Sequence, residues 1–204
     1  MLFSDTYKTI EGRSEGLFKD RGSRFISLAF PVRSQEEIKE KLEALRKEYH
    51  DARHHCYAYV LNPDRQLWRA NDDGEPSGTA GKPILGQINS NELTNILIVV
   101  IRYFGGTLLG VSGLINAYRT AAAEAIANAR VTEMTVKSVY RVSFPYLSMN
   151  DVMKVLKEEA VGQENHTYGD TCSIDISFRL SSTERIIERI SKIDGVQTKY
   201  LFTV

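Results

Sequence analysis

Apolar and polar positions along the chain recur with clear periods, which predict a mixture of strands and helices. Three strands are expected near the start, over residues 7–11, 14–19 and 23–32. Ser34 and Glu37 then form a capping-box signature. The apolar residues that follow recur at spacings of four, three and four, at Ile38, Leu42, Leu45 and Tyr49. This stretch therefore predicts an amphipathic helix with one face against a sheet and a charged face in solvent.

Further periodic stretches extend this pattern to residue 129. Turn residues between two β-rich runs predict a hairpin, and the near-continuous apolar run after it is typical of a strand covered on both faces. The elements expected here are the hairpin, a short helix limited by Pro83, that buried strand and a long alanine-rich helix, over residues 55–61 with 66–70, 79–88, 93–102 and 110–129.

The remaining stretch predicts the order βαββαβ, which is the ferredoxin-like arrangement. Its expected elements cover residues 136–145, 148–159, 162–168, 172–180, 182–193 and 196–204. We therefore predict an α+β protein of two domains, residues 1–134 and 135–204, with the boundary near Thr132 to Thr135.

Charge and composition limit the partners. Lys+Arg and Asp+Glu number 26 each, and the two signs also balance within each predicted domain. A nucleic acid would therefore have to bind a local patch, because no basic body attracts phosphate from a distance. Cys56 and Cys172 lie far apart in the sequence, so we expect no disulfide framework, and reduced thiols suit a cytoplasmic protein.

Residues 1–15 do not resemble a signal peptide, and the apolar run Ile96 to Ile101 is too short to span a bilayer. We expect a cytoplasmic protein with no membrane contact.

Glycines gather in two segments, Asn71–Pro83 and Arg102–Leu114, and glycine is used where the backbone bends sharply or approaches another group. Neither segment contains a phosphate-binding P-loop or a dinucleotide fingerprint. Gly105 to Gly113 predicts a strand that turns into a helix start, whose free N–H groups suit an anion. The alternative is that these small residues let the helix pack closely on the sheet.

The carboxylates Asp72, Asp73 and Glu75 precede a proline within good turn sequence. Their spacing does not match a calcium loop, so we expect no metal and no cofactor. A clamp between these carboxylates and Arg102, at the end of the buried strand, is favoured because arginine is seldom buried without a partner.

Three further side chains form a cluster after Arg53. On a strand His54 and His55 point to opposite faces and do not chelate one ion, whereas His54 and Cys56 share a face. A thiol nucleophile needs a positioned base, which neighbours on one strand do not supply. We therefore expect Cys56 to be structural and Cys172 to be a core residue.

Several motifs together resemble the IMPACT/YigZ-type family. They are Asp72–Pro83, Arg102–Gly110, Ser112–Tyr118, Ser23–Phe25 and His54–Ala58, and the resemblance is specific over about residues 20 to 120. It implies a ribosomal-protein-like left-handed βαβ domain before the ferredoxin-like domain, an order similar to the fourth and fifth domains of elongation factor G. Eukaryotic relatives are translation regulators that restrain the kinase response to amino-acid starvation. They carry an additional domain for that partner, so it is not transferred here.

The resemblance therefore implies a non-catalytic, translation-linked factor that binds RNA, the ribosome or a protein of translation control. The candidate binding residues are Arg24, His54, Lys82, Arg102, Tyr103, Phe104, Gly105, Gly106, Gly110, Gly113 and Arg119. The residues expected to shape the loops are Asp72, Asp73, Gly74, Glu75, Pro76, Gly78, Thr79 and Gly81.

Two alternatives stay open. In the first, a cleft between the two loops is an enzyme site for a small anionic or phosphorylated substrate, with Asp72 or Glu75 as acid/base, Arg102 as anion clamp and the helix start at Gly110 as oxyanion or phosphate site. The enzyme hypothesis lacks a nucleophile. For the favoured binding function we expect no catalytic residue. In the second, the chain is a protein-binding adaptor with an exposed apolar patch.

Overall fold

The computed structural model describes residues 5–204. Residues 1–4, the start of the segment assessed for a signal peptide, lie outside the described residues. The chain divides into two compact units. The first unit comprises residues 7–134, and the second comprises residues 135–204 with Asp5 and Thr6.

The first unit is built on a five-stranded sheet with the order β2-β3-β6-β4-β5. All of its neighbouring strands are antiparallel. Because β3 and β4 both pair with β6, they run parallel to each other on either side of it, joined through a helix as a βαβ unit. The strands are β2 (Ser14–Asp20), β3 (Ser23–Pro31), β4 (His54–Leu61), β5 (Leu67–Asn71) and β6 (Ile96–Tyr103).

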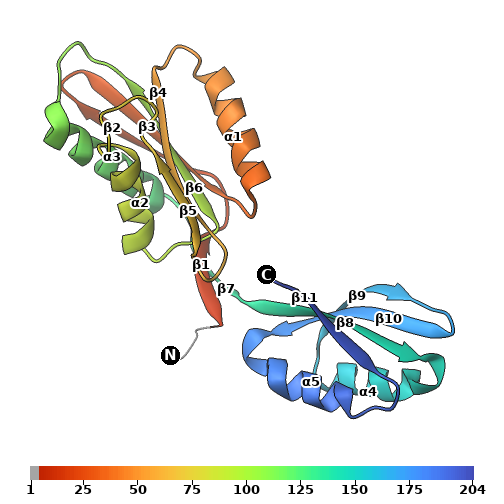
Figure 1. The fold of residues 1–204 in the computed structure, drawn as a ribbon. Coiled ribbons are helices and arrows are strands. Elements are labelled where there is room, and N and C mark those ends of the chain that lie inside the picture. The colour runs from red at the N-terminus through yellow and green to blue at the C-terminus, as the bar shows by residue number, and fades with distance from the viewer. Residues whose placement is uncertain (1–4) are drawn as a thin grey trace. The chain divides into compact units, whose positions relative to one another are not determined.

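Helices cover both faces of this sheet (Figure 1). Helix α1 (Gln35–Glu48) lies on one face, and α2 (Gly81–Ser90) and α3 (Gly110–Ala127) lie on the other. The predicted capping box is present, since Ser34 Oγ accepts a hydrogen bond from the Glu37 N–H at 3.2 Å. Pro83 falls in the first turn of α2, where its missing N–H costs no helical hydrogen bond.

Strand β6 forms the centre of the first unit, and its residues Ile96 to Ile101 are fully buried. Alternate side chains enter different cores. Ile96, Ile98 and Val100 pack with α2 and α3, whereas Leu97, Val99 and Ile101 pack with α1. This is the doubly covered strand predicted from the apolar run, and it fixes the position of Arg102 at its end.

One strand was not predicted. β7 (Val131–Thr135) pairs with β1 (Thr6–Ile10) in a two-stranded sheet, whereas the sequence suggested a boundary around Thr132 to Thr135. A short stretch of mixed polarity gives little local signal for a strand whose partner lies more than a hundred residues away.

The second unit has the ferredoxin-like fold that the sequence predicted. Its four-stranded antiparallel sheet has the order β11-β8-β10-β9, with two helices packed on one face. Cys172 is fully buried in this core, as expected. The elements are β8 (Lys137–Pro145), a 3₁₀ turn (Tyr146–Ser148), α4 (Met149–Glu158), β9 (Gly162–Thr167), β10 (Thr171–Arg179), a 3₁₀ turn (Leu180–Ser182), α5 (Thr183–Ser191) and β11 (Gln197–Thr203).

Candidate functional site

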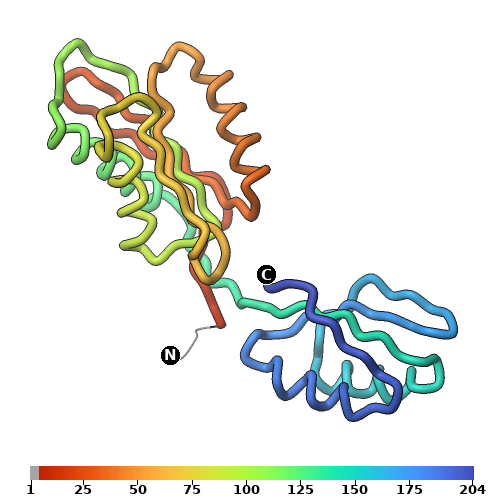
Figure 2. Tube along the Cα trace, in the orientation of Figure 1, coloured from red at the N-terminus to blue at the C-terminus, as the bar shows by residue number. Residues whose placement is uncertain are grey.

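The two glycine-rich segments meet at one end of the five-stranded sheet, where β6 ends and β2 turns into β3. Figure 2 shows that turn beside the loop after β6. The backbones touch there, since a Cβ added at Gly105 would lie 1.9 Å from the carbonyl carbon of Gly22. Ser23 Oγ also accepts a hydrogen bond from the Gly105 N–H at 3.1 Å. Close backbone packing therefore accounts for the glycine at position 105.

A buried chain of polar groups ties the two loops together. Arg102 donates to Glu75 Oε1 at 2.6 Å, with side chains that are 7% and 4% exposed. The same oxygen accepts a hydrogen bond from the Tyr118 hydroxyl at 2.8 Å, and Cys56 Sγ donates to that hydroxyl at 3.3 Å. This is the carboxylate–arginine clamp that the sequence predicted. Its extension through Tyr118 to Cys56 was not foreseen.

Burial determines the protonation of the groups in this hydrogen-bonded series. Burial raises the pKa of the Cys56 thiol and of the Tyr118 hydroxyl, and the nearby Glu75 carboxylate adds to both shifts. Neither group is therefore an ionised nucleophile at neutral pH. The structural role expected for Cys56 agrees with this environment.

Asp72 organises the first glycine-rich loop from inside. Its carboxylate accepts hydrogen bonds from the backbone N–H groups of Gly78, Ala80 and Gly81 at 2.8–3.0 Å. Ala80 and Gly81 open α2, so the loop's own carboxylate occupies the positive end of that helix. Burial alone would raise the pKa of Asp72. The three N–H donors and nearby Lys82 outweigh burial, and the pKa is lowered.

Replacing this carboxylate is expected to destabilise the loop in a pH-dependent manner. We predict that Asp72→Asn lowers the free energy of unfolding at pH 7 by about 1–3 kcal/mol, the usual range for buried donors left unpaired. Because the folded pKa is lowered, the carboxylate's stabilisation is complete above its unfolded pKa of about 4 and is lost as the pH falls through the folded pKa. Urea denaturation should therefore show the two proteins converging below about pH 4. A constant difference from pH 7 to pH 3 would contradict this role.

The histidine cluster also supports the loop. Asp73 accepts a hydrogen bond from the His55 N–H at 2.7 Å and from Arg46 at 3.1 Å, while His54 Nδ1 lies 2.8 Å from the Asp73 carbonyl oxygen. His55 is buried, and burial lowers its pKa despite the nearby Asp73 carboxylate. His54 therefore holds the loop that contains Gly74, whose φ of 87° favours glycine.

Acid–base chemistry at these carboxylates would require breaking contacts that shape the loops. Glu75 is paired with Arg102 and Tyr118, and Asp72 is bonded to three N–H groups. Within residues 5–204, no three His, Cys, Asp or Glu side chains gather closely enough to hold a metal ion. The start of α3 at Gly110 carries no side-chain cap.

The solvent-facing part of this end combines cations with apolar side chains. We call Arg21, Arg24, Tyr103, Phe104 and Leu108 the loop-end surface. The Arg24 guanidinium lies 4.8 Å from the centre of the Tyr103 ring, while the ring of Phe104 is 5.6 Å from Arg102. Phe104 and Leu108 are 55% and 81% exposed. Among the described residues, neither Arg21 nor Arg24 forms an ion pair.

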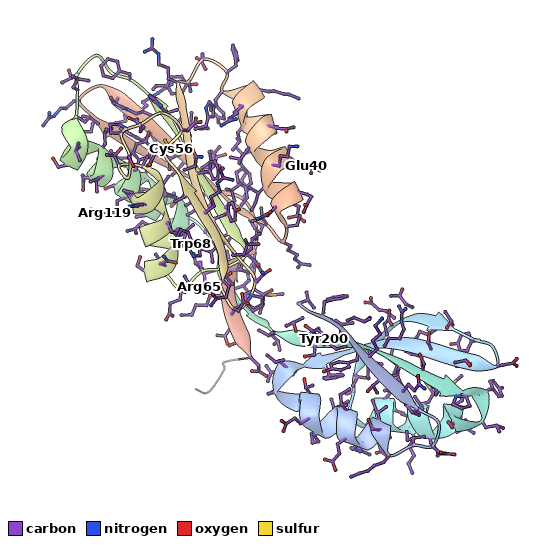
Figure 3. The ribbon with its side chains drawn as sticks, in the orientation of Figure 1. Glu40, Cys56, Arg65, Trp68, Arg119 and Tyr200 are labelled. Carbon is purple, nitrogen blue, oxygen red and sulfur yellow. The ribbon has the colours of Figure 1, made fainter. Side chains whose placement is uncertain are left out.

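The structure does not gather every candidate residue at this surface. Arg102 is 6% exposed and faces Glu75. Lys82 lies in the first turn of α2 beside Trp68, and Arg119 is exposed on α3 (Figure 3). Sequence reasoning missed Arg21, which a search for cations in the turn before Ser23 would have found. The glycines at 106, 110 and 113 belong to the loop and to the start of α3.

The remaining loop-shaping candidates lie in the first glycine-rich segment. Thr79 is buried, and its hydroxyl donates to the Pro76 carbonyl oxygen at 2.7 Å. Gly78 has a φ of 78°, and a Cβ on Gly81 would lie 2.5 Å from the Asn71 nitrogen. These contacts close the turn and seat α2 on the end of β5.

Comparison with known proteins places these features in context. The Impact N-terminal domain matches residues 21–126. The chain is 35% identical to IMPACT family member YvyE of Bacillus subtilis, over 92% of this chain and 87% of that protein. It is 38% identical to IMPACT family member YigZ of Escherichia coli, over 66% of this chain and 67% of that protein. A crystal structure of a hypothetical protein has a TM-score of 0.76 at 27% identity, covering 97% of this chain and 98% of that one.

A more distant relative is Protein IMPACT of Oryctolagus cuniculus, at 38% identity over 45% of this chain and 30% of that protein. None of the helices within residues 5–204 is long and apolar enough to cross a membrane.

Proposed function

Since the chain belongs to the IMPACT family, we propose that it is a non-catalytic, translation-linked factor that binds RNA or the ribosome through its loop-end surface. The link to translation is the expectation that this family carries. The proposed site is supported by the arrangement at the end of the sheet. Arg24, which forms no ion pair among the described residues, lies over the Tyr103 ring, and the side chains of Phe104 and Leu108 are exposed nearby in sequence.

The buried clamp has a structural role that differs from the binding role proposed for the exposed residues. Glu75 and Arg102 neutralise each other inside the unit and hold the loop after β6. Outside this clamp, Arg21, Arg24 and Phe104 are exposed, and they are residue types that suit nucleic acid. Arginine contacts phosphate, and exposed aromatic rings stack on bases. Such a local patch is consistent with a chain of zero formal net charge.

Protein partners of eukaryotic relatives are not carried over to this chain. The match covers only 30% of the rabbit protein's length, so what that protein binds is not assigned to this chain. The partner proposed for this chain is therefore the ribosome or its RNA.

Changing the loop-end surface is expected to weaken RNA binding without unfolding the chain. Phe104→Ala should reduce affinity for a single-stranded RNA by about tenfold, within the roughly 1–3 kcal/mol that stacking on one base contributes. Arg24→Glu should weaken binding and lower the slope of affinity against salt by about one ion. Fluorescence anisotropy with a labelled oligonucleotide, repeated with ribosomes by co-sedimentation, measures both effects.

The matched control is Lys39→Glu, because Lys39 is exposed on α1 and its one ion pair within residues 5–204 is with Glu43, 4.0 Å away. It makes the same charge change away from the loop-end surface. Equal losses in Lys39→Glu and Arg24→Glu would indicate a general charge effect. Unchanged affinity in both Arg24→Glu and Phe104→Ala would reject this surface as the RNA site.

A further inference from the structure

The edge strand β5 has one free side. It is the last strand in the five-stranded sheet and pairs only with β4, in continuous register from Leu61–Leu67 to Tyr57–Asn71. Every second residue of an edge strand turns its N–H and C=O outward, which makes the edge a template for another strand. Natural edges are commonly blocked by proline, charged side chains or a bulge. β5 has no proline and no bulge, and its one charged side chain is Arg69.

A groove flanks this edge on each face of the sheet. On the α2 face, a groove of about 450 Å³ is lined by Trp68 and Ala70 of β5 with Lys82 and Leu85 of α2. On the α1 face, a groove of about 630 Å³ is lined by Arg69 and Asn71 of β5 together with α1 and β4. The two sets of β5 residues alternate along the strand. A strand added beside β5 would therefore direct its own alternate side chains toward both grooves.

Two large apolar side chains of β5 are exposed to solvent. Trp68, which is labelled in Figure 3, is 58% exposed. Its neighbour Leu67 is 36% exposed. The opposite groove has the parallel rings of Tyr57 and Tyr59 in its wall, with centres 6.5 Å apart. Both tyrosines are buried, so Trp68 is the aromatic side chain that this edge presents to solvent. Large exposed apolar side chains in a cluster are typical of binding surfaces.

Charge indicates what would bind. Arg69 is exposed on β5 and Lys82 is exposed in the α2 groove, and neither forms an ion pair among residues 5–204. Asp72, which lines the same groove as Lys82, already accepts three backbone hydrogen bonds. The α1 wall of the other groove carries both signs, at Glu36, Glu43, Lys39 and Arg46. Over the lining residues, Asp72 offsets Lys82 in the α2 groove, whereas three cations face two carboxylates in the α1 groove. The excess positive charge therefore lies on the α1 face, where Arg69 is exposed.

We infer that β5 binds an extended, acidic peptide segment of another protein by strand addition. The backbone of the segment pairs with the free edge of β5. Its alternate side chains enter the two grooves, with apolar groups against Trp68 and Leu85 and acidic groups facing Lys82 and Arg69. Backbone pairing supplies affinity and the grooves supply specificity, as in other peptide-binding sheets.

A second copy of this chain fits the edge less well. Two β5 strands in antiparallel pairing would bring Arg69 and its counterpart onto the same short ribbon, where like charges repel. The inference concerns an element other than the loop-end surface and does not depend on RNA binding.

The experiment is a selection of random linear peptides on the immobilised full chain, followed by binding of the synthesised winners. Trp68 is the chain's single tryptophan, so its emission reports directly on the α2 groove. We expect winners with alternating apolar and acidic residues, and a blue shift of Trp68 emission on binding. Methylation of alternate backbone nitrogens on the side that pairs with β5 should abolish binding, because it removes the ladder donors.

Arg69→Glu combined with Lys82→Glu should weaken binding of the winning peptide at least tenfold, whereas Lys154→Glu in the second unit should leave it unchanged. The double variant should retain the RNA affinity of the unchanged protein, which separates this surface from the loop-end surface. A failure to enrich any peptide, winners that bind without moving Trp68 emission, or binding that tolerates backbone methylation would each overturn the inference. A dimer in sedimentation that dissociates in the double variant would also overturn it, in favour of a second copy.

Discussion

Glu75→Ala is expected to lower the free energy of unfolding of the first unit by about 3–5 kcal/mol, the usual effect of removing one partner of a buried ion pair. The substitution leaves a charged guanidinium on Arg102, a residue that is 6% exposed and whose Nε atom already lacks a hydrogen-bond partner among the described residues. It also removes the acceptor of the Tyr118 hydroxyl. Because a domain is stable by only about 5–15 kcal/mol, the variant should be close to unfolding.

Urea denaturation followed by Trp68 fluorescence measures this effect, since the single tryptophan belongs to the first unit. Arg102→Met should be similarly harmful alone. Combining it with Glu75→Leu should cost much less than the sum of the single changes, because an apolar pair can replace a buried ion pair. Arg130→Ala removes an exposed partner of Glu11 and should cost less than about 1 kcal/mol. A loss for Glu75→Ala no larger than that of this control would show that the clamp does not hold the loops.

Gly105→Ala should destabilise the first unit by about 2–3 kcal/mol and displace the loop after β6, because forced overpacking typically costs 1–3 kcal/mol. The new Cβ would lie 1.9 Å from the Gly22 carbonyl carbon and 2.1 Å from the Ser23 nitrogen. Both are backbone atoms, so no side-chain rotation relieves the contact. RNA binding should fall together with stability, because Phe104 precedes this residue.

Gly86→Ala provides the opposite control. Nothing lies within 4 Å of a Cβ at Gly86, which is inside α2, so alanine should stabilise the helix by up to about 1 kcal/mol. Denaturation curves of the two variants should therefore move in opposite directions. Equal stability of Gly105→Ala and the unchanged protein would mean that the Gly22–Gly105 contact is not rigid.

Much of the fold was predictable because its signals are local. The period of Ile38 to Tyr49 defined α1, and the apolar run before Arg102 defined the central strand. The clamp was predictable in outline, because an arginine ending a buried strand needs a carboxylate and the first glycine-rich loop offered three. Which carboxylate it takes depends on three-dimensional placement, and the structure selects Glu75.

The rest depended on contacts between distant segments. β6 inserts between β3 and β4, and this order leaves β5 as an edge with Trp68 in solvent. A strand pattern alone does not reveal its neighbours. Tyr118 lies within an alanine-rich helix and gave no polar signal, yet its hydroxyl completes the buried chain. Lys82 was grouped with Arg24 because both are basic, whereas the structure places it beside Trp68.

Binding of the intact chain to ribosomes and to free single-stranded RNA across a salt series would decide the proposed function. We predict co-sedimentation with ribosomes at low salt that weakens steadily as salt rises, since arginine contacts with phosphate release counterions. Stronger binding to ribosomes than to free RNA would indicate a factor that recognises a particular ribosomal surface. Absence of binding to both at low salt would contradict the proposal.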